Sequence, residues 1–388
     1  MNRVISASLA AFLLFILASC TAGGGSSSSG GTSAEVSSSH VSSQSSIPSV
    51  QSQSDLKPLT EFTKGNNLPK SSVIGKSFIK GSLYKGPSVN YRKADGKATL
   101  GVWWWDITYL VNSKEGVSVD QILDCLLASN VTEIYLSTSA MLPWSEQQAQ
   151  GGTVDEGMVS EADVRGFVAK CGKLGIRVAA LGGSPNWVVE SDMGMGLYNF
   201  LDRVNEYQVN ADNNEKFYGV HLDVEPHTFD DFQTNRSKYC ALLAALTANA
   251  SEYAKKMNLL LEWDIFSYFD EKDKVFDPRS GKEVTMLDIM FTYCDTVGVM
   301  TYYNNGLAQF ERGELEVEYA KKYNKKVVLS SETIRISPSS VSYYLPGRDV
   351  LITESEVLRK KLEETGVEKY GFAVHHAVSF YALMNREK

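Results

Sequence analysis

The sequence predicts an α/β fold, a parallel (β/α)8 or TIM barrel that follows a long N-terminal extension. Eight strand-like segments alternate with helical stretches beyond about residue 99. No glycine-rich phosphate loop follows the first of them, which counts against the alternative of an open, doubly wound sheet. The chain has 388 residues, 43% hydrophobic and 22% charged, a composition typical of folded domains with a substantial core.

The strands are predicted from short runs rich in β-branched and aromatic residues. Helices between them have recognisable ends: Ser118 with Gln121 and Thr353 with Glu356 fit capping boxes, and Gly175 fits a helix C-terminus, as does Gly366. The predicted strands are Leu100–Asp106, Glu133–Ser137, Arg177–Gly182, Tyr218–Glu225, Leu259–Asp264, Thr296–Tyr302, Lys326–Glu332 and Tyr370–His376.

The N-terminal extension predicts export. Residues 1–19 have a basic start and a short apolar run, as in a signal peptide. They lead into Leu17-Ala18-Ser19-Cys20, which resembles the bacterial lipobox and implies lipid attachment at Cys20. Residues 20–57 are rich in Ser and Gly and predict a disordered tether. Residues 58–98 form a lead-in segment, and 99–388 form the barrel. We therefore expect a lipid-anchored protein of the bacterial envelope, at the outer membrane or the cell surface.

The charge of the chain limits its classes of ligand. The net charge of −8 and the absence of a basic run make nucleic acid an unlikely class of ligand.

Four cysteines of the barrel region lie among apolar residues without C-x-x-C spacing. They predict buried free thiols, with one or two disulfides as the alternative. These are Cys125, Cys171, Cys240 and Cys294.

Polar and aromatic residues gather at the predicted carboxyl ends of the strands, where barrels of this kind carry their active sites. His375 and His376 point to opposite faces, so we expect one of them to reach the pocket. The candidate substrate-binding residues are Trp105, Asp106, His221, Glu262, Asp264, Tyr303, Asn304, His375 and His376.

The fourth predicted strand carries three ionisable residues on one face. Side chains alternate along a strand, so His221, Asp223 and Glu225 point the same way, into the barrel. Glu225 is last and therefore nearest the mouth. Neighbouring carboxylates raise one another's pKa, which keeps a general acid protonated near neutral pH. A structural ion network is the alternative reading of the same pattern.

This strand resembles the D-x-x-D-x-D-x-E motif of family 18 glycoside hydrolases, and Met300-Thr301-Tyr302 resembles that family's M-x-Y. The resemblance implies that Glu225 is the proton donor, that Asp223 orients a substrate N-acetyl group and that Tyr302 contacts the intermediate. The chain departs from the family pattern at several positions: Tyr218, His221, Tyr303 and the pair His375-His376.

A second resemblance is to the retaining barrel glycosidases, which carry glutamates at the ends of strands four and seven. Glu225-Pro226 and Glu332 occupy these places, although Val224 stands where that clan has asparagine. This resemblance implies a double displacement with Glu332 as nucleophile. Both resemblances assign the role of general acid to Glu225.

The predicted function is that of a surface-anchored glycoside hydrolase that acts on an oligo- or polysaccharide without a cofactor. One alternative is a carbohydrate-binding or envelope protein on a glycosidase-like barrel, because fold does not determine function. Another is a metal-dependent hydrolase or deacetylase with zinc held by His221, Asp223, Glu225, His227 and one of the two final histidines. The sequence does not predict an oligomeric state.

Overall fold

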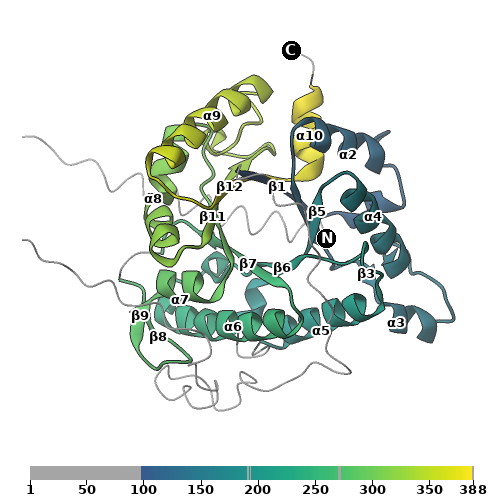
Figure 1. Cartoon of the computed structure of the whole chain (residues 1–388), viewed down its shortest axis with the longest axis horizontal. Helices are drawn as coiled ribbons and strands as arrows, with labels where there is room; N and C mark the ends of the chain where they lie inside the picture. The colour runs from purple at the N-terminus through teal and green to yellow at the C-terminus, as the bar shows by residue number, and fades with distance from the viewer. Residues whose placement is uncertain (1–97, 190–191, 193, 270–271, 387–388) are drawn as a thin grey trace, which may run out of the picture. The chain divides into compact units, whose positions relative to one another are not determined.

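The computed structural model describes residues 98–189, 192, 194–269 and 272–386. Eight parallel strands close into a barrel in sequence order, so the (β/α)8 prediction is confirmed (Figure 1). The predicted signal peptide, tether and nearly all of the lead-in lie outside the described residues. The barrel strands are β1 (Thr99–Trp104), β2 (Glu133–Ser137), β5 (Arg177–Gly182), β6 (Gly219–Asp223), β7 (Leu260–Phe266), β10 (Thr296–Met300), β11 (Lys326–Glu332) and β12 (Tyr370–His375).

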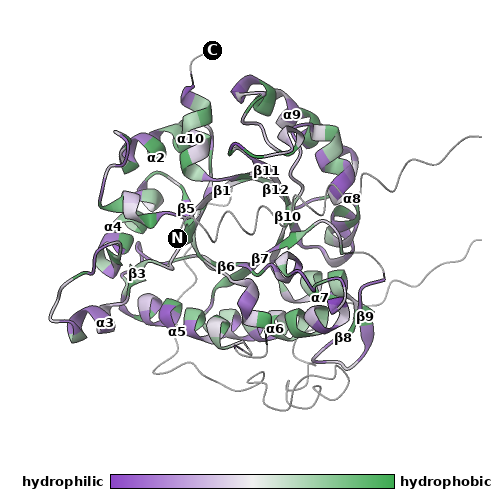
Figure 2. Cartoon of the chain, turned by 180° about the vertical axis from the view of Figure 1, so that it is seen from behind, coloured by the Kyte–Doolittle hydropathy of each residue, from purple (hydrophilic) through white to green (hydrophobic). Residues whose placement is uncertain are grey.

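Helices surround the barrel, and two small sheets extend the loops (Figure 1). Helices of the ring carry both apolar and polar segments, as expected where one face packs on strands and the other meets water (Figure 2). The helices are α2 (Val119–Ala128), α3 (Trp144–Ala149), α4 (Glu161–Lys173), α5 (Met195–Asn210), α6 (Arg236–Lys256), α7 (Met286–Tyr293), α8 (Gly306–Tyr323), α9 (Arg348–Glu364) and α10 (Ala377–Asn385). The small sheets pair β3 (Met141–Leu142) with β4 (Val159–Ser160), and β8 (Lys274–Phe276) with β9 (Glu283–Thr285).

Local signals at the helix ends are mostly confirmed. Ser118 and Gln121 form a complete capping box at α2, and Gly175 and Gly366 adopt positive φ angles of 79° and 71° after α4 and α9. The capping box predicted at Thr353 is wrong. Helix α9 already begins at Arg348, and the Thr353 hydroxyl donates to the Asp349 carbonyl one turn earlier within it.

The four cysteines of the barrel region are free thiols, as predicted, with Cys125 half-buried and the others buried. Among the residues described, no helix combines the length and the apolar character that a bilayer-spanning segment requires.

Candidate active site

Strand β6 delivers ionisable side chains to the barrel interior. Val220 and Leu222 are fully buried on the alternate face, as the alternation predicts, and His221 is buried inside the barrel. The strand ends at Asp223, two residues earlier than predicted. Glu225 instead occupies the N-cap position of a short 3-10 helix, η5 (Pro226–Thr228), without a side-chain cap hydrogen bond, and Pro226 has no N–H for a strand ladder.

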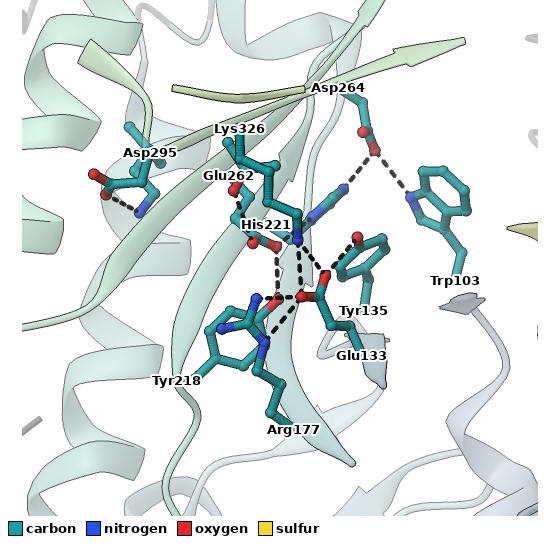
Figure 3. Close-up of polar contacts among 12 residues, drawn as sticks. Trp103, Glu133, Tyr135, Arg177, Tyr218, His221, Glu262, Asp264, Asp295 and Lys326 are labelled. Carbon is teal, nitrogen blue, oxygen red and sulfur yellow. Dashed lines mark hydrogen bonds and ion pairs between the residues drawn. The ribbon is translucent and has the colours of Figure 1, made fainter. Parts of the chain in front are cut away.

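His221 lies between two carboxylates of β7 (Figure 3). Its Nε2 is 2.6 Å from Oδ2 of Asp264, and its Nδ1 is 3.1 Å from Oε2 of Glu262. Burial alone would lower the pKa of His221, but the charges and hydrogen bonds of Asp264 and Glu262 raise it to about 10. His221 is therefore an imidazolium that donates from both nitrogens.

Below His221, a layer of ionic contacts lies at the amino ends of the strands (Figure 3). Glu262 accepts a 2.7 Å hydrogen bond from the Tyr218 hydroxyl. The fully buried Glu133 pairs with Arg177, whose Nε is 3.0 Å away, and with Lys326 at 2.8 Å. Burial would raise the pKa of Glu262, but the hydrogen bond from His221 and the nearby cations lower it to about 2. A structural ion network thus fills the lower barrel, and Glu262 lies within it, away from the mouth.

Three carboxyl groups meet above His221. Asp223 and Asp264 are register partners on adjacent parallel strands, and Glu225 and Asp264 line one narrow pocket with His227, Phe266 and Met300. Burial, followed by the charge of Asp264, raises the pKa of Asp223 to about 7. Burial, with the charges of Asp223 and Asp264, raises the pKa of Glu225 well above its usual range.

Glu225 is accessible and Glu332 is not. The Glu225 side chain is 20% exposed, whereas that of Glu332 is fully buried. Oε1 of Glu332 accepts hydrogen bonds from the N–H groups of Thr333 and Ile334, and Oε2 lies 2.8 Å from Nδ1 of His375. Both oxygens of the predicted nucleophile are thus engaged by the protein.

Two aromatic candidates lie at the barrel mouth. Trp105 is half-buried and donates from Nε1 to Nε2 of His375 at 2.8 Å. Tyr302 is half-buried, with its ring centroid 6.3 Å from that of His375. Burial raises the pKa of the Tyr302 hydroxyl, and the charges of Glu332 and Asp264 add to the effect, so the phenol stays neutral.

Other predicted binding residues serve local structure. Asp106 caps the 3-10 helix η3 (Ile107–Leu110) and pairs with Lys114 at 2.6 Å. The Tyr303 hydroxyl accepts from Arg312, and Asn304 donates to the carbonyls of Ser339 and Ser342 in the loop before α9. His376 occupies the N-cap position of α10, and of the two final histidines it is His375 that accepts the hydrogen bond from Trp105.

Sequence reasoning missed three contributors. Trp103 was not among the predicted site residues, yet its Nε1 donates to Oδ2 of Asp264 at 2.9 Å. Tyr135 stacks on the His221 ring at 3.8 Å, a position that strand alternation on β2 could have revealed. His227, considered only as a zinc ligand, has its Nε2 3.6 Å from Oε1 of Glu225. Burial, with the charge of Arg236, lowers the pKa of His227 to about 3, so its ring is neutral.

A metal site is not preformed in the described part of the chain, where no three His, Cys, Asp or Glu residues are grouped to hold an ion. Of the residues considered for zinc, His221 directs both ring nitrogens at carboxylates.

Comparison with known proteins gives remote structural likenesses. Neither a protein-family profile nor a curated protein sequence matches the chain. A class V chitinase mutant from Cycas revoluta, solved with (GlcNAc)3, is 12% identical over 74% of this chain and 97% of its own, with a TM-score of 0.42. A chitinase from Chromobacterium violaceum is 10% identical over 75% and 100%, with a TM-score of 0.41. A β-N-acetylhexosaminidase from Bacteroides fragilis is 11% identical over 61% and 51%, with a TM-score of 0.35. At these identities the likeness concerns the barrel fold alone.

Proposed function

We propose that the barrel hydrolyses glycosidic bonds of an oligo- or polysaccharide, with Glu225 as the general acid. The observation that supports this most is the environment of Glu225: its side chain is partly exposed at the barrel mouth, and burial, followed by the charges of Asp223 and Asp264, raises its pKa. A carboxyl group that stays protonated near neutral pH has the proton that a leaving glycosidic oxygen needs.

The nucleophile that fits this site is the acetamido group of an N-acetylated sugar. Oδ1 of Asp223 is buried and has no hydrogen-bond partner among the described residues, so its acceptor capacity is left for a substrate N–H. The alternative nucleophile, Glu332, accepts three hydrogen bonds and has no exposed surface. These contacts favour the mechanism implied by the family 18 resemblance over the two-glutamate mechanism.

The test compares the full chain with its Glu225→Gln variant on fluorogenic chitooligosaccharides and on matching cello-oligosaccharides. We expect turnover of the N-acetylated series only, and a decrease in kcat of about 10²- to 10⁴-fold in the variant, the usual contribution of general acid catalysis. Glu364→Gln, which removes an exposed carboxylate from the end of α9, is the matched control.

Two results would overturn this assignment. Glycan binding without turnover by the wild type would favour a carbohydrate-binding protein. Release of acetate that depends on added zinc would favour a deacetylase, the other hydrolase class considered from the sequence.

We also propose that the barrel is held at the envelope surface by lipid on Cys20. The support is the lipobox-like sequence alone, because Cys20 lies outside the described residues. Cells fed an alkyne fatty acid should label the wild-type chain and leave Cys20→Ser unlabelled. Label on both chains, or on neither, would contradict the proposal.

A further inference from the structure

We propose that Glu332 and His375 form a proton-controlled support for the indole of Trp105. In this support, the indole is held at the barrel mouth only while Nε2 of His375 carries no proton. The consequence for sugar binding rests on the function proposed above, whereas the support itself does not.

The direction of each hydrogen bond follows from the donors available. An indole N–H can only donate, so Nε2 of His375, 2.8 Å from Nε1 of Trp105, must accept. The ring proton of the neutral imidazole then lies on Nδ1, where it is donated to Oε2 of Glu332 at 2.8 Å. The three side chains form one chain of donors and acceptors that fixes the histidine tautomer.

Glu332 anchors this chain to the backbone. Its Oε1 accepts the N–H groups of Thr333 at 2.6 Å and Ile334 at 2.8 Å. The side chain is fully buried, so the second oxygen stays directed at His375. This is a role for Glu332 that neither glycosidase resemblance assigns, because it positions another side chain and does not touch substrate.

A second proton on His375 breaks the contact with the indole. The proton enters on Nε2, which then becomes a donor that faces the donor of Trp105, and two donors cannot share a hydrogen bond. The carboxylate of Glu332 keeps its bond to Nδ1 and stabilises the cation. Protonation thus releases Trp105 while His375 stays in place.

The groups that face His375 favour this second proton. Three carboxyl groups approach it from separate strands: Glu332 on β11, Asp223 on β6 and Asp264 on β7. Burial alone would lower its pKa, but Glu332 and then these two aspartates raise it above the ordinary value of 6.5. His376 does not oppose them as a cation, since burial and the neighbouring His375 lower its pKa to about 3. The remaining neighbours are the rings of Trp103, Trp105 and Tyr302.

When the hydrogen bond holds the indole of Trp105 in place, the indole provides a flat apolar surface for a sugar ring. When the hydrogen bond is broken, the indole rotates freely and must lose that freedom on binding, which weakens affinity for the sugar. We therefore expect sugar affinity to decrease as the pH falls through the pKa of His375. Sugar binding then depends on the proton of His375, and proton donation depends on the proton of Glu225.

The test follows Trp105 fluorescence without any substrate. The emission difference between the wild type and Trp105→Phe is measured from about pH 5 to about pH 9, the range in which histidines titrate. We expect one transition with a midpoint above 6.5. His375→Gln should abolish the transition, because its side-chain carbonyl accepts from the indole and does not titrate. A flat wild-type signal, or a transition that persists in His375→Gln, would overturn the proposal.

Glu332→Gln provides an independent variant. Its amide oxygen keeps the two backbone hydrogen bonds, so its NH2 group faces Nδ1 of His375 and donates to it. Nε2 then carries the proton at every pH, and the signal should stay at its acidic value throughout. A normal transition in this variant would contradict the proposed chain of hydrogen bonds. Since these measurements contain no glycan, a failure of the support and a failure of the hydrolase assignment are distinguishable.

Discussion

Nε2 of His221 lies 2.6 Å from Oδ2 of Asp264, so the fourth and fifth strands of the barrel are joined by an ion pair just below the mouth. The family 18 pattern has an aspartate where this chain has His221. Here Asp264, from the next strand, provides a carboxylate beside Asp223 instead. The positive charge of the histidine pairs with the Asp264 carboxylate in a buried place.

The charge on His221 should make stability depend on pH. Its folded pKa of about 10 lies above its ordinary value of 6.5, so its contribution is present below about pH 6.5 and is lost as the pH rises through 10. We expect the wild-type free energy of unfolding to fall by several kcal/mol over this interval. His221→Gln should lack that decrease and lose about 3 to 5 kcal/mol at neutral pH, the usual cost of breaking a buried pair. Urea unfolding of the wild type and the variant at a series of pH values measures both effects. If the two stabilities changed with pH in parallel, the assignment of the charge to His221 would be contradicted.

Asp264→Asn should shift the pH dependence of hydrolysis. In the proposed mechanism, proton donation requires protonated Glu225, so activity should fall as the pH rises through the pKa of that group. The charge of Asp264 helps to raise this pKa, so its removal should move the descending limb of the kcat/KM profile to lower pH. Glu364→Gln removes one exposed carboxylate and should leave the limb in place. An unmoved limb in Asp264→Asn would show that Asp264 does not act on the general acid.

Glu332→Gln and Glu225→Gln should change different kinetic parameters. If Glu332 only supports His375, its replacement weakens binding by about 1 kcal/mol, the worth of a typical hydrogen bond, and mainly raises KM. Glu225→Gln should instead lower kcat. Steady-state kinetics on the same chitooligosaccharide separates the two parameters. Equal losses of kcat would restore the two-glutamate mechanism.

Gly298→Ala should disturb the site from the neighbouring strand. A Cβ at Gly298 would overlap Oδ1 of Asp264, so the carboxylate would have to move. We expect a loss of about 1 to 3 kcal/mol, typical of an overpacked core. Gly166→Ala is the control, because its Cβ meets nothing within 4 Å on helix α4, and it should be neutral or stabilise by up to about 1 kcal/mol. Thermal unfolding of both variants tests the difference, and equal stabilities would contradict the contact.

Much of the fold was predictable because its signals are local. Strand alternation and helix caps involve residues two to four positions apart, so the eight strands, the capping box at Ser118 and the shared face of His221, Asp223 and Glu225 could be read directly. The error at Thr353 has the same origin. Its capping pattern is compatible with a helix start, but the loop that ends at Gly347 allows α9 to begin earlier.

The sequence by itself determined the barrel and the ionisable face of its fourth strand, because both follow from local alternation. Only the tertiary structure decided which residues pair: His221 with Asp264, Trp105 with His375, and Glu332 with the backbone of Thr333 and Ile334. The two side-chain pairs join residues 43 and 270 positions apart. Such contacts depend on strand register and barrel closure, and a carboxylate at a strand end becomes an acid, a nucleophile or an anchor according to the donors that closure places around it.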